Sequence, residues 1–276
     1  MEDEIYAYEC LTSFREPIIV SIMESLNIPR GSSGLDAGCG IGSIARILSD
    51  KVGEKGSVIG LDFSKDFINY ARDKYSRKKY SNNNLEFQEG DINSLPFDDN
   101  AFDWVWSSDT VWAGPKELGC PSEDPIPIIK EYYRVLKPSG RVYLMYWSSQ
   151  KLLPGYPVLE AALNNTPSAT APYSRKTKPM NDALNSRFWL EESGFTNIET
   201  KTYVEDIEGP LKDEDKKALY MLFQMFWEGK ETERGIDEKD LTNYKNITNP
   251  DSQNYILNNK YYHGFYTYTL FKGVKR

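Results

Sequence analysis

The segment from Leu35 to Gly42, which reads LDAGCGIG, constrains the fold more than any other part of the chain. A short apolar run precedes it and a helix-like run follows it, and glycine occupies every second position from Gly38 onward. Glycine lets the backbone adopt a positive φ and approach a ligand where a Cβ would collide. The first turn of the next helix can also direct unpaired N–H groups at a carboxylate. The segment therefore predicts a strand–loop–helix unit with a ligand at the loop.

Short strand-like runs alternate with longer helix-like runs from residue 34 to residue 147, a pattern typical of βαβ units and a parallel sheet. We expect α/β architecture with seven strands, mostly parallel, an antiparallel last strand and helices on both faces. The predicted strands are Ser33–Ala37, Ser57–Asp62, Leu85–Glu89, Phe102–Ser107, Arg141–Trp147, Phe195–Asp206 and Phe265–Lys272. The predicted helices are Ser43–Val52, Lys65–Lys79, Pro125–Leu136, a short one at Val158–Leu163, and Asn181–Ser193.

The chain is predicted to hold N-terminal cap helices over residues 1–30 and one larger domain over residues 31–276. Two irregular segments, at about 148–180 and 209–262, are interpreted as insertions into that domain. Both fall at the carboxyl ends of strands, where open α/β sheets bind their ligands. We expect them to form a substrate lid, with surface decoration or a dimer interface as the open alternatives.

Composition limits the partners. A formal net charge of -8 and a pI near 5.0 oppose binding to a phosphate backbone, so we expect a small-molecule partner and no nucleic acid. The three cysteines are an odd number without paired spacing, which argues against a disulfide framework or a cysteine zinc site, and no metal-ligand cluster is visible. The acidic N-terminus lacks a secretion-signal pattern, and no apolar run is long enough to span a bilayer. These features predict a cytoplasmic protein with no membrane partner; its oligomeric state stays open.

The glycine spacing bears on the kind of cofactor. It reads G-x-G-x-G, whereas the dinucleotide fingerprint needs a further glycine where this chain has Ser43. Asp62 ends the next predicted strand, and a carboxylate there can accept hydrogen bonds from both ribose hydroxyls of an adenosine. Because nicotinamide and adenosyl cofactors both use that contact, Asp62 predicts an adenosine without choosing between them.

Two further motifs extend the pattern: Gly90-Asp91-Ile92 after the third strand, and Arg134-Val135-Leu136-Lys137-Pro138-Ser139-Gly140-Arg141 before the fifth. With the glycine loop and Gly60-Leu61-Asp62-Phe63-Ser64, they resemble the class I S-adenosylmethionine-dependent methyltransferases from about Leu35 to Trp147. The chain is most similar to small-molecule enzymes of the ubiquinone/menaquinone-biosynthesis type. The resemblance implies a Rossmann-like fold, S-adenosyl-L-methionine as cofactor, and methyl transfer to a small-molecule acceptor by in-line displacement.

The resemblance also implies a set of cofactor-binding residues at the strand ends. The glycine loop would line the methionine part, Asp36 would brace that loop, Asp62 would hold the ribose, and Asp91 would accept from the adenine amino group. Ile92 would offer its backbone N–H to the adenine ring, and Phe63 would pack on one adenine face. The full predicted set is Asp36, Gly38, Cys39, Gly40, Asp62, Phe63, Gly90, Asp91, Ile92, Ser107 and Ser108.

Methyl transfer depends mainly on alignment, so a base is needed only where a proton ties up the acceptor's lone pair. The candidate bases are Asp109 and His263, the sole histidine, together with tyrosines such as Tyr261 and Tyr262. Three tryptophans near strand ends, Trp106, Trp112 and Trp147, are candidates for aromatic walls, although Trp106 is equally interpretable as a core residue. Tyr6, Tyr8 and Arg15 resemble a cap over bound cofactor, with a solvated helix face as the alternative.

The sequence also bears on three rival functions. A nicotinamide-dependent reductase is suggested by the Y-x-x-x-K spacings at Tyr70–Lys74 and Tyr75–Lys79, but both pairs lie in the helix after the second strand. A methyltransferase acting on nucleic-acid bases would show Asn or Asp, two prolines and an aromatic residue where this chain has Ser107-Ser108-Asp109-Thr110. A cofactor-binding module without turnover stays open, as does the identity of the acceptor atom.

Overall fold

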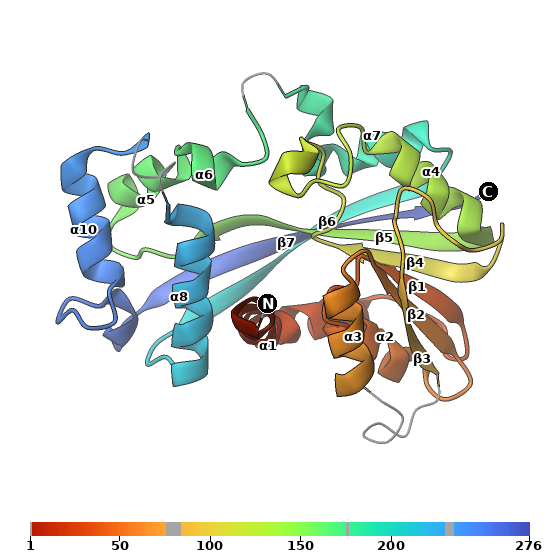
Figure 1. Cartoon of the computed structure of the whole chain (residues 1–276), viewed down its shortest axis with the longest axis horizontal. Helices are drawn as coiled ribbons and strands as arrows, with labels where there is room; N and C mark the ends of the chain where they lie inside the picture. The colour runs from red at the N-terminus through yellow and green to blue at the C-terminus, as the bar shows by residue number, and fades with distance from the viewer. Residues whose placement is uncertain (1, 76–83, 175–176, 230–234) are drawn as a thin grey trace.

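The computed structural model describes residues 2–75, 84–174, 177–229 and 235–276, with side chains described from residue 5. Within these residues one seven-stranded sheet runs in the order β3-β2-β1-β4-β5-β7-β6 (Figure 1). Neighbouring strands are parallel except at β7, which is antiparallel to both β5 and β6, as the sequence predicts. The strands are β1 (Ser33–Ala37), β2 (Ser57–Asp62), β3 (Leu85–Glu89), β4 (Phe102–Ser108), β5 (Leu136–Lys151), β6 (Thr196–Glu208) and β7 (His263–Val274).

The first four strands have the predicted bounds to within one residue, whereas β5 is much longer than predicted. The expected turn at residues 137–140 lies inside β5, where the pairing with β4 shifts register and Ser139 has a φ of 66°. At the other end, Lys151 pairs with Phe265 of β7. The antiparallel partner therefore extends β5 well past the point where β4 ends.

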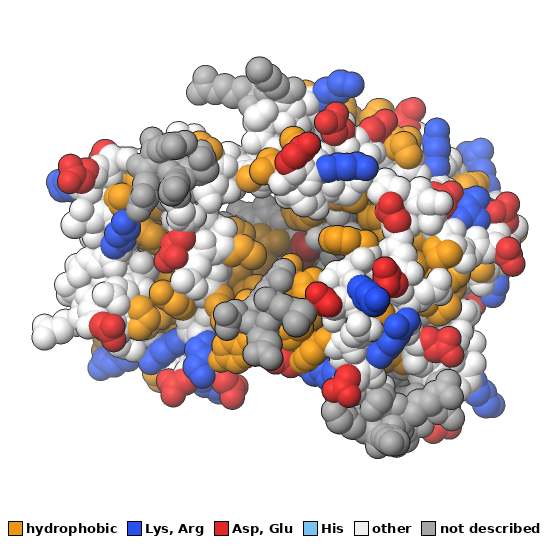
Figure 2. Space-filling model, in the orientation of Figure 1, with side chains coloured by type: hydrophobic (Ala, Val, Ile, Leu, Met, Phe, Trp, Pro, Cys, Tyr) orange, Lys and Arg blue, Asp and Glu red, His pale blue; other side chains and the backbone are white. Residues whose placement is uncertain are grey.

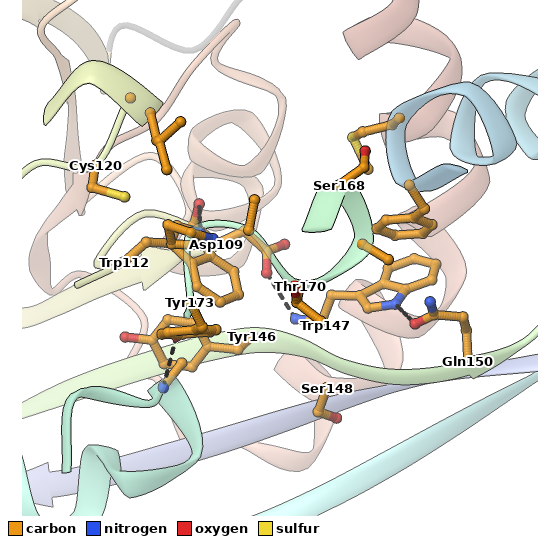
Figure 3. Close-up of a pocket in the computed structure, with 18 of the residues that line it drawn as sticks. Asp109, Trp112, Cys120, Tyr146, Trp147, Ser148, Gln150, Ser168, Thr170 and Tyr173 are labelled. Atoms are coloured by element: carbon orange, nitrogen blue, oxygen red, sulfur yellow. Dashed lines mark hydrogen bonds between the residues drawn. The ribbon is translucent and has the colours of Figure 1, made fainter. Parts of the chain in front are cut away.

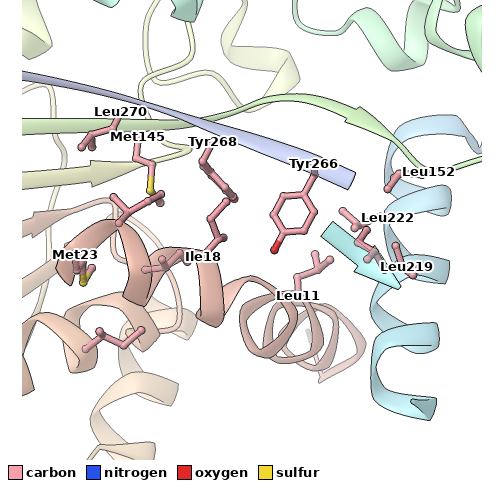
Figure 4. Close-up of a cluster of buried hydrophobic side chains, with 14 of the residues drawn as sticks. Leu11, Ile18, Met23, Met145, Leu152, Leu219, Leu222, Tyr266, Tyr268 and Leu270 are labelled. Carbon is pink, nitrogen blue, oxygen red and sulfur yellow. The ribbon is translucent and has the colours of Figure 1, made fainter. Parts of the chain in front are cut away.

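Helices cover both faces of the sheet. On one face lie α1 (Glu2–Ser25), α2 (Ser43–Val52) and α3 (Lys65–Lys74), and on the other α4 (Ile126–Val135) and α7 (Ser186–Glu192) (Figure 1). Successive strand residues point to opposite faces, so Trp104 and Trp106 join the first layer while Val105 joins the second. Figure 4 shows the first layer, where Leu11 and Ile18 of α1 lie beside Tyr266 and Tyr268 of β7.

Two predicted helices differ from the structure. The prediction of one helix over Asn181–Ser193 is wrong, because α7 begins only at Ser186 and two short 3₁₀ turns precede it. Asp182 interrupts the helix: its backbone is extended (ψ 136°), and its side chain accepts a hydrogen bond from the Leu184 N–H. The other helix, α3, ends at Lys74, and the predicted remainder from 76 to 79 lies outside the described residues.

The two predicted insertions carry helices beside the extended ends of β5, β6 and β7 (Figure 1). The first holds α5 (Pro157–Asn164) and α6 (Pro167–Thr170), and the second holds α8 (Asp213–Trp227) and α10 (Glu238–Thr248). A hydrogen bond from the buried Trp227 indole N–H to Asn164 Oδ1 (2.9 Å) joins the two. The N-terminal segment forms a single long helix, α1, that packs against α8 and β6. Across the described residues, no helix is both long and apolar enough to cross a membrane.

Candidate cofactor and acceptor site

The three glycines after β1 serve different purposes. Gly38 has a φ of 80°, and a Cβ there would lie 2.2 Å from Thr110 Cγ2. Gly42 has a φ of 82°, and its Cβ would lie 2.6 Å from the Phe87 ring. Gly40 has a φ of 53°, and a Cβ added there would have no other atom of the described residues within 4 Å. Packing and backbone geometry therefore require glycine at the outer two positions, and of the three glycines only Gly40 borders open space.

Asp62 fixes this loop from the end of β2. Its Oδ2 accepts the Gly40 N–H at 2.9 Å, and its Oδ1 accepts the Ser64 N–H at 2.9 Å. The carboxylate is buried, and burial raises its pKa. An ionised carboxylate has about four lone-pair sites, so these two bonds leave acceptor capacity for ligand hydroxyls.

Asp36 lies on β1 directly below the loop and is fully buried. Among the described residues its Oδ2 has no hydrogen-bond partner, while the backbone N–H of Ala45 bonds to the carboxyl. Burial, with a contribution from the Asp62 charge, raises the pKa of Asp36 to about 8. Because an unpaired buried acceptor is unfavourable, a cationic ligand group nearby would stabilise the site. The open backbone at Gly40 and this unpartnered oxygen fit a cofactor that carries an ammonium and a sulfonium.

The predicted adenine-side residues follow β2 and β3, which are neighbours in the sheet. Phe63 is 78% exposed, and the Gly90 N–H bonds to the Asp62 carbonyl at 2.9 Å. Asp91 is exposed and its Oδ1 accepts the Asn93 backbone N–H at 2.8 Å, while Ile92 is buried. The structure thus brings these residues together at one edge, with an exposed ring and a carboxylate available to a ligand.

Three other predicted cofactor residues have roles within the protein. The Ser107 hydroxyl is buried and donates to the Ala37 carbonyl at 3.0 Å, which links β4 to β1. The Ser108 carbonyl accepts the Thr110 hydroxyl at 2.8 Å. Cys39 is buried with its thiol against Gly60, and burial raises the thiol pKa. The Ser107 and Cys39 side chains and the Ser108 backbone thus make contacts within the protein. Cofactor binding by the backbone of these three residues stays a prediction.

A cavity of about 710 Å³ adjoins the loop that follows β4. In Figure 2 hydrophobic side chains gather around the hollow on this face. Both insertions contribute lining residues: α6 and the segment to Tyr173 from the first, and Leu222, Met225 and Phe226 of α8 from the second. The prediction that the two insertions form a substrate lid stays a prediction. Aromatic rings form much of the wall: Trp112, Tyr146, Trp147 and Tyr173, which Figure 3 labels, together with Phe226.

Asp109 is the centre of a hydrogen-bond network at this cavity. It follows β4 with a φ of 49°, and its Oδ1 accepts the Trp147 backbone N–H at 2.7 Å. Its Oδ2 accepts from Arg15 Nη1 at 3.1 Å and from the Tyr268 hydroxyl at 2.8 Å. Burial raises the pKa of Asp109, and the guanidinium opposes that shift. Burial alone would lower the pKa of Arg15, but Tyr268 and Asp109 hold it above its ordinary value.

The other candidate bases do not line the cavity. His263 begins β7 far beyond the end of β4, its side chain is 60% exposed, and its Nε2 lies 3.7 Å from Asp206 Oδ1. Tyr261 is exposed, and the buried Tyr262 hydroxyl donates to the Leu152 carbonyl. The extension of β5 and β7 carries these residues outward, so the structure does not support the predicted role of His263 as a base.

The aromatic and cap predictions have mixed outcomes. Trp112 and Trp147 line the cavity, whereas Trp106 is fully buried in the core beneath it. Tyr8 and Arg15 of α1 also line the cavity, so Arg15 is not on a solvated face; Tyr6 is 46% exposed. Sequence reasoning missed Tyr146, Tyr173 and Tyr268. The alternation of β7 marks Tyr268 as an inward residue, but no sequence signal identifies its partner Asp109.

Comparison with known proteins decides the family. Residues 29–220 match a protein family described as "Methyltransferase domain". The chain belongs to this methyltransferase family. The predicted family is thereby confirmed, and the Rossmann-like sheet described above is the fold predicted for it.

Curated relatives of this methyltransferase-family chain include two named demethylmenaquinone methyltransferases. The one from Oceanobacillus iheyensis is 37% identical over 134 residues, covering 49% of this chain and 52% of the relative. The one from Staphylococcus carnosus is 32% identical over 196 residues, covering 66% of this chain and 75% of the relative. The chain thus spans about half the length of the first of these relatives.

Two solved structures share the fold. The YcgJ protein from Bacillus subtilis has a TM-score of 0.55 and 19% identity, covering 94% of this chain and 98% of that one. A Haemonchus contortus phosphoethanolamine N-methyltransferase, solved with S-adenosyl-L-methionine, has a TM-score of 0.56 and 18% identity, covering 100% of this chain and 57% of that one. At such identities the likeness concerns the fold alone.

Proposed function

We propose that this chain transfers a methyl group from S-adenosylmethionine to a small-molecule acceptor by in-line displacement. Membership of the methyltransferase family supports the reaction class. The observation that carries the proposal is the loop after β1, where Gly40 faces open space next to the buried carboxylates of Asp36 and Asp62. A cavity large enough for a small molecule adjoins the loop after β4. That loop contacts the glycine loop through the Thr110 hydroxyl, which donates to the Gly38 carbonyl at 3.3 Å.

The cofactor would be held by residues at the ends of β1, β2 and β3. In this proposal Asp62 accepts from the ribose hydroxyls, Phe63 packs on the adenine, and Asp91 accepts from the adenine amino group. A positive charge bound near the glycine loop would stabilise the ionised form of Asp36, whose Oδ2 has no partner among the described residues. Bound there, S-adenosylmethionine supplies an electrophilic methyl group on a sulfonium.

The chain's own contribution to the reaction is alignment and exclusion of water. Aromatic side chains and residues of the two insertions line the cavity beside the loop after β4, where they would hold the acceptor and exclude water. Asp109 accepts three hydrogen bonds already, so we assign it as a positioning residue that fixes Arg15 and the backbone at Trp147. The base role predicted for Asp109 is not needed for an acceptor whose lone pair is free.

Calorimetric titration with S-adenosylmethionine tests the cofactor half of the proposal. We expect Asp62→Ala to weaken binding at least about tenfold, because it removes the ribose acceptor and frees the Gly40 N–H, and one good hydrogen bond to a charged group is worth about 1.5–3 kcal/mol. The control is Asp206→Ala, an exposed carboxylate on the far part of β6, which should leave the affinity unchanged. Unchanged affinity in Asp62→Ala would contradict the assignment.

A product assay tests the transfer itself. Purified protein and labelled cofactor are incubated with a metabolite panel that includes demethylmenaquinone, the compound in the names of the relatives. A methylated product from any compound supports an enzyme. Cofactor binding without product across the panel would instead favour a binding module without turnover.

A further inference from the structure

The charge of the acceptor cavity is set by very few side chains. Among the described residues that line it, those with charge are Arg15, Asp109 and Asp182. Asp182 lies between two 3₁₀ turns just after the first insertion, and its Oδ1 accepts a local backbone N–H from Leu184. The described lining therefore holds one cation and two carboxylates.

The single cation is paired inside the protein. Arg15 Nη1 lies 3.1 Å from Asp109 Oδ2 and donates to the Tyr268 hydroxyl at 2.9 Å. The two side chains of the ion pair are only 18% and 20% exposed, so solvent screens their interaction less than it would at the surface. Asp109 cannot turn away freely, because its other oxygen holds the Trp147 N–H at 2.7 Å.

The remaining walls suit a neutral or cationic guest. Trp112 lies within 5.5 Å of Tyr146 and 6.3 Å of Tyr173, measured between ring centroids, and the rings meet edge to face. In Figure 3 Trp147 lies apart from Trp112, Tyr146 and Tyr173, and its ring centroid is 5.8 Å from that of Phe226. Aromatic faces carry negative electrostatic potential, attract cations and stack on flat unsaturated groups.

We propose that Asp109 masks Arg15, so that the cavity admits neutral or cationic acceptors with a flat unsaturated part and rejects anionic ones. This inference rests on the proposed function, because it assigns the cavity to the acceptor. An entering carboxylate or phosphate would face two carboxylates and aromatic faces. Arg15, the only cation among the described lining residues, is already neutralised by Asp109. Specificity of this kind comes from repulsion as much as from attraction.

The test uses three probes with one ring and different charge: benzylamine, benzyl alcohol and benzoate. Their dissociation constants are measured by ligand-observed NMR on the full chain loaded with S-adenosylmethionine. In the unsubstituted protein we expect benzoate to bind at least about tenfold more weakly than benzyl alcohol or benzylamine. Asp109→Asn unmasks Arg15 and should improve benzoate binding about tenfold, whereas Arg15→Gln should improve benzylamine binding instead.

Two controls make the result specific. Asp99→Asn breaks a comparable ion pair with Arg134 on an exposed surface and should leave all three constants unchanged. The double variant Arg15→Gln/Asp109→Asn should return the order of the unsubstituted protein, because the net charge of the lining is then unchanged. If circular dichroism shows that Asp109→Asn does not fold, Arg15→Gln alone still tests the inference, because it should lower the dissociation constant of benzylamine.

Equal affinity for benzoate and benzyl alcohol in the unsubstituted protein would overturn the inference. So would folded single variants that keep the original order, or a failure of both uncharged and cationic probes to bind. Calorimetry on the same samples separates the two proposals. If the protein binds S-adenosylmethionine but the dissociation constants of the three probes do not follow the expected order, only the acceptor inference is contradicted. Absence of cofactor binding would contradict the proposed function itself.

Discussion

At the scale of single residues, the site combines positions that serve the fold with positions that face a ligand. The sequence predicts glycine at 38, 40 and 42 for one common reason, yet only Gly40 borders open space. The distinction depends on Phe87 of β3 and on Thr110 in the loop after β4, which both contact the glycine loop, so it could not be predicted from the loop alone. Asp36 was predicted from the resemblance as a brace; its unpartnered oxygen appears only once burial is known.

Alanine substitutions separate these glycine roles. A left-handed φ costs an alanine about 1–2 kcal/mol. Gly40→Ala should lose only about that much stability but bind S-adenosylmethionine at least about tenfold more weakly, since its methyl group fills the open space. Gly38→Ala adds a clash with Thr110 and should be clearly less stable than Gly40→Ala in urea unfolding. Equal loss of stability in both, with cofactor affinity retained in Gly40→Ala, would contradict this assignment.

The raised pKa of Asp36 predicts a pH-dependent stability. In the folded protein the Asp36 carboxyl keeps its proton up to about pH 8, whereas in the unfolded chain it loses the proton near pH 3.9. The raised pKa therefore stabilises the folded state fully below about pH 3.9, and this stabilisation is lost progressively as the pH rises to about 8. Asp36→Asn cannot ionise. Its stability relative to the unsubstituted protein should therefore rise between pH 5 and pH 8, by at most about 1.4 kcal/mol per pH unit. Parallel urea-unfolding profiles for the two proteins would contradict the shift.

At the scale of elements, local pattern predicts the central βαβ units well and the second half less well. Bounds for β1, β2 and β3 follow from short apolar runs that end at turn residues. The length of β5 depends on pairing with β7, more than a hundred residues later, which no local window contains. The helix predicted from residue 181 fails because the Asp182 side chain competes for a backbone N–H. The N-terminal segment, predicted as cap helices, is one helix, α1, whose residues Ile18, Ile19 and Ile22 join the main core.

That packing predicts that α1 unfolds together with the sheet. Ile22→Ala should lower the free energy of unfolding by about 2–5 kcal/mol, because it leaves a cavity in the core, and the transition should remain single. Glu24→Ala, an exposed neighbour on the same helix, should change stability by no more than about 0.5 kcal/mol. A separate early transition for α1, with an unchanged main transition, would show that the helix is a detachable cap.

At the scale of the whole molecule, the site is assembled from segments that lie far apart in the chain. Strand ends supply the cofactor loops, α1 supplies Arg15, and both insertions supply walls of the cavity. The sequence predicts that these segments meet at one edge, because parallel strands share their carboxyl ends there. It does not predict the ion pair between Arg15 and Asp109, which are 94 residues apart and belong to different layers.

The most direct test of the central claim is calorimetric titration of the unsubstituted chain with S-adenosylmethionine and, separately, with a nicotinamide dinucleotide. We expect saturable binding of one S-adenosylmethionine per chain and no measurable binding of the dinucleotide. Binding of the dinucleotide, or no heat from S-adenosylmethionine with folded protein, would contradict the account.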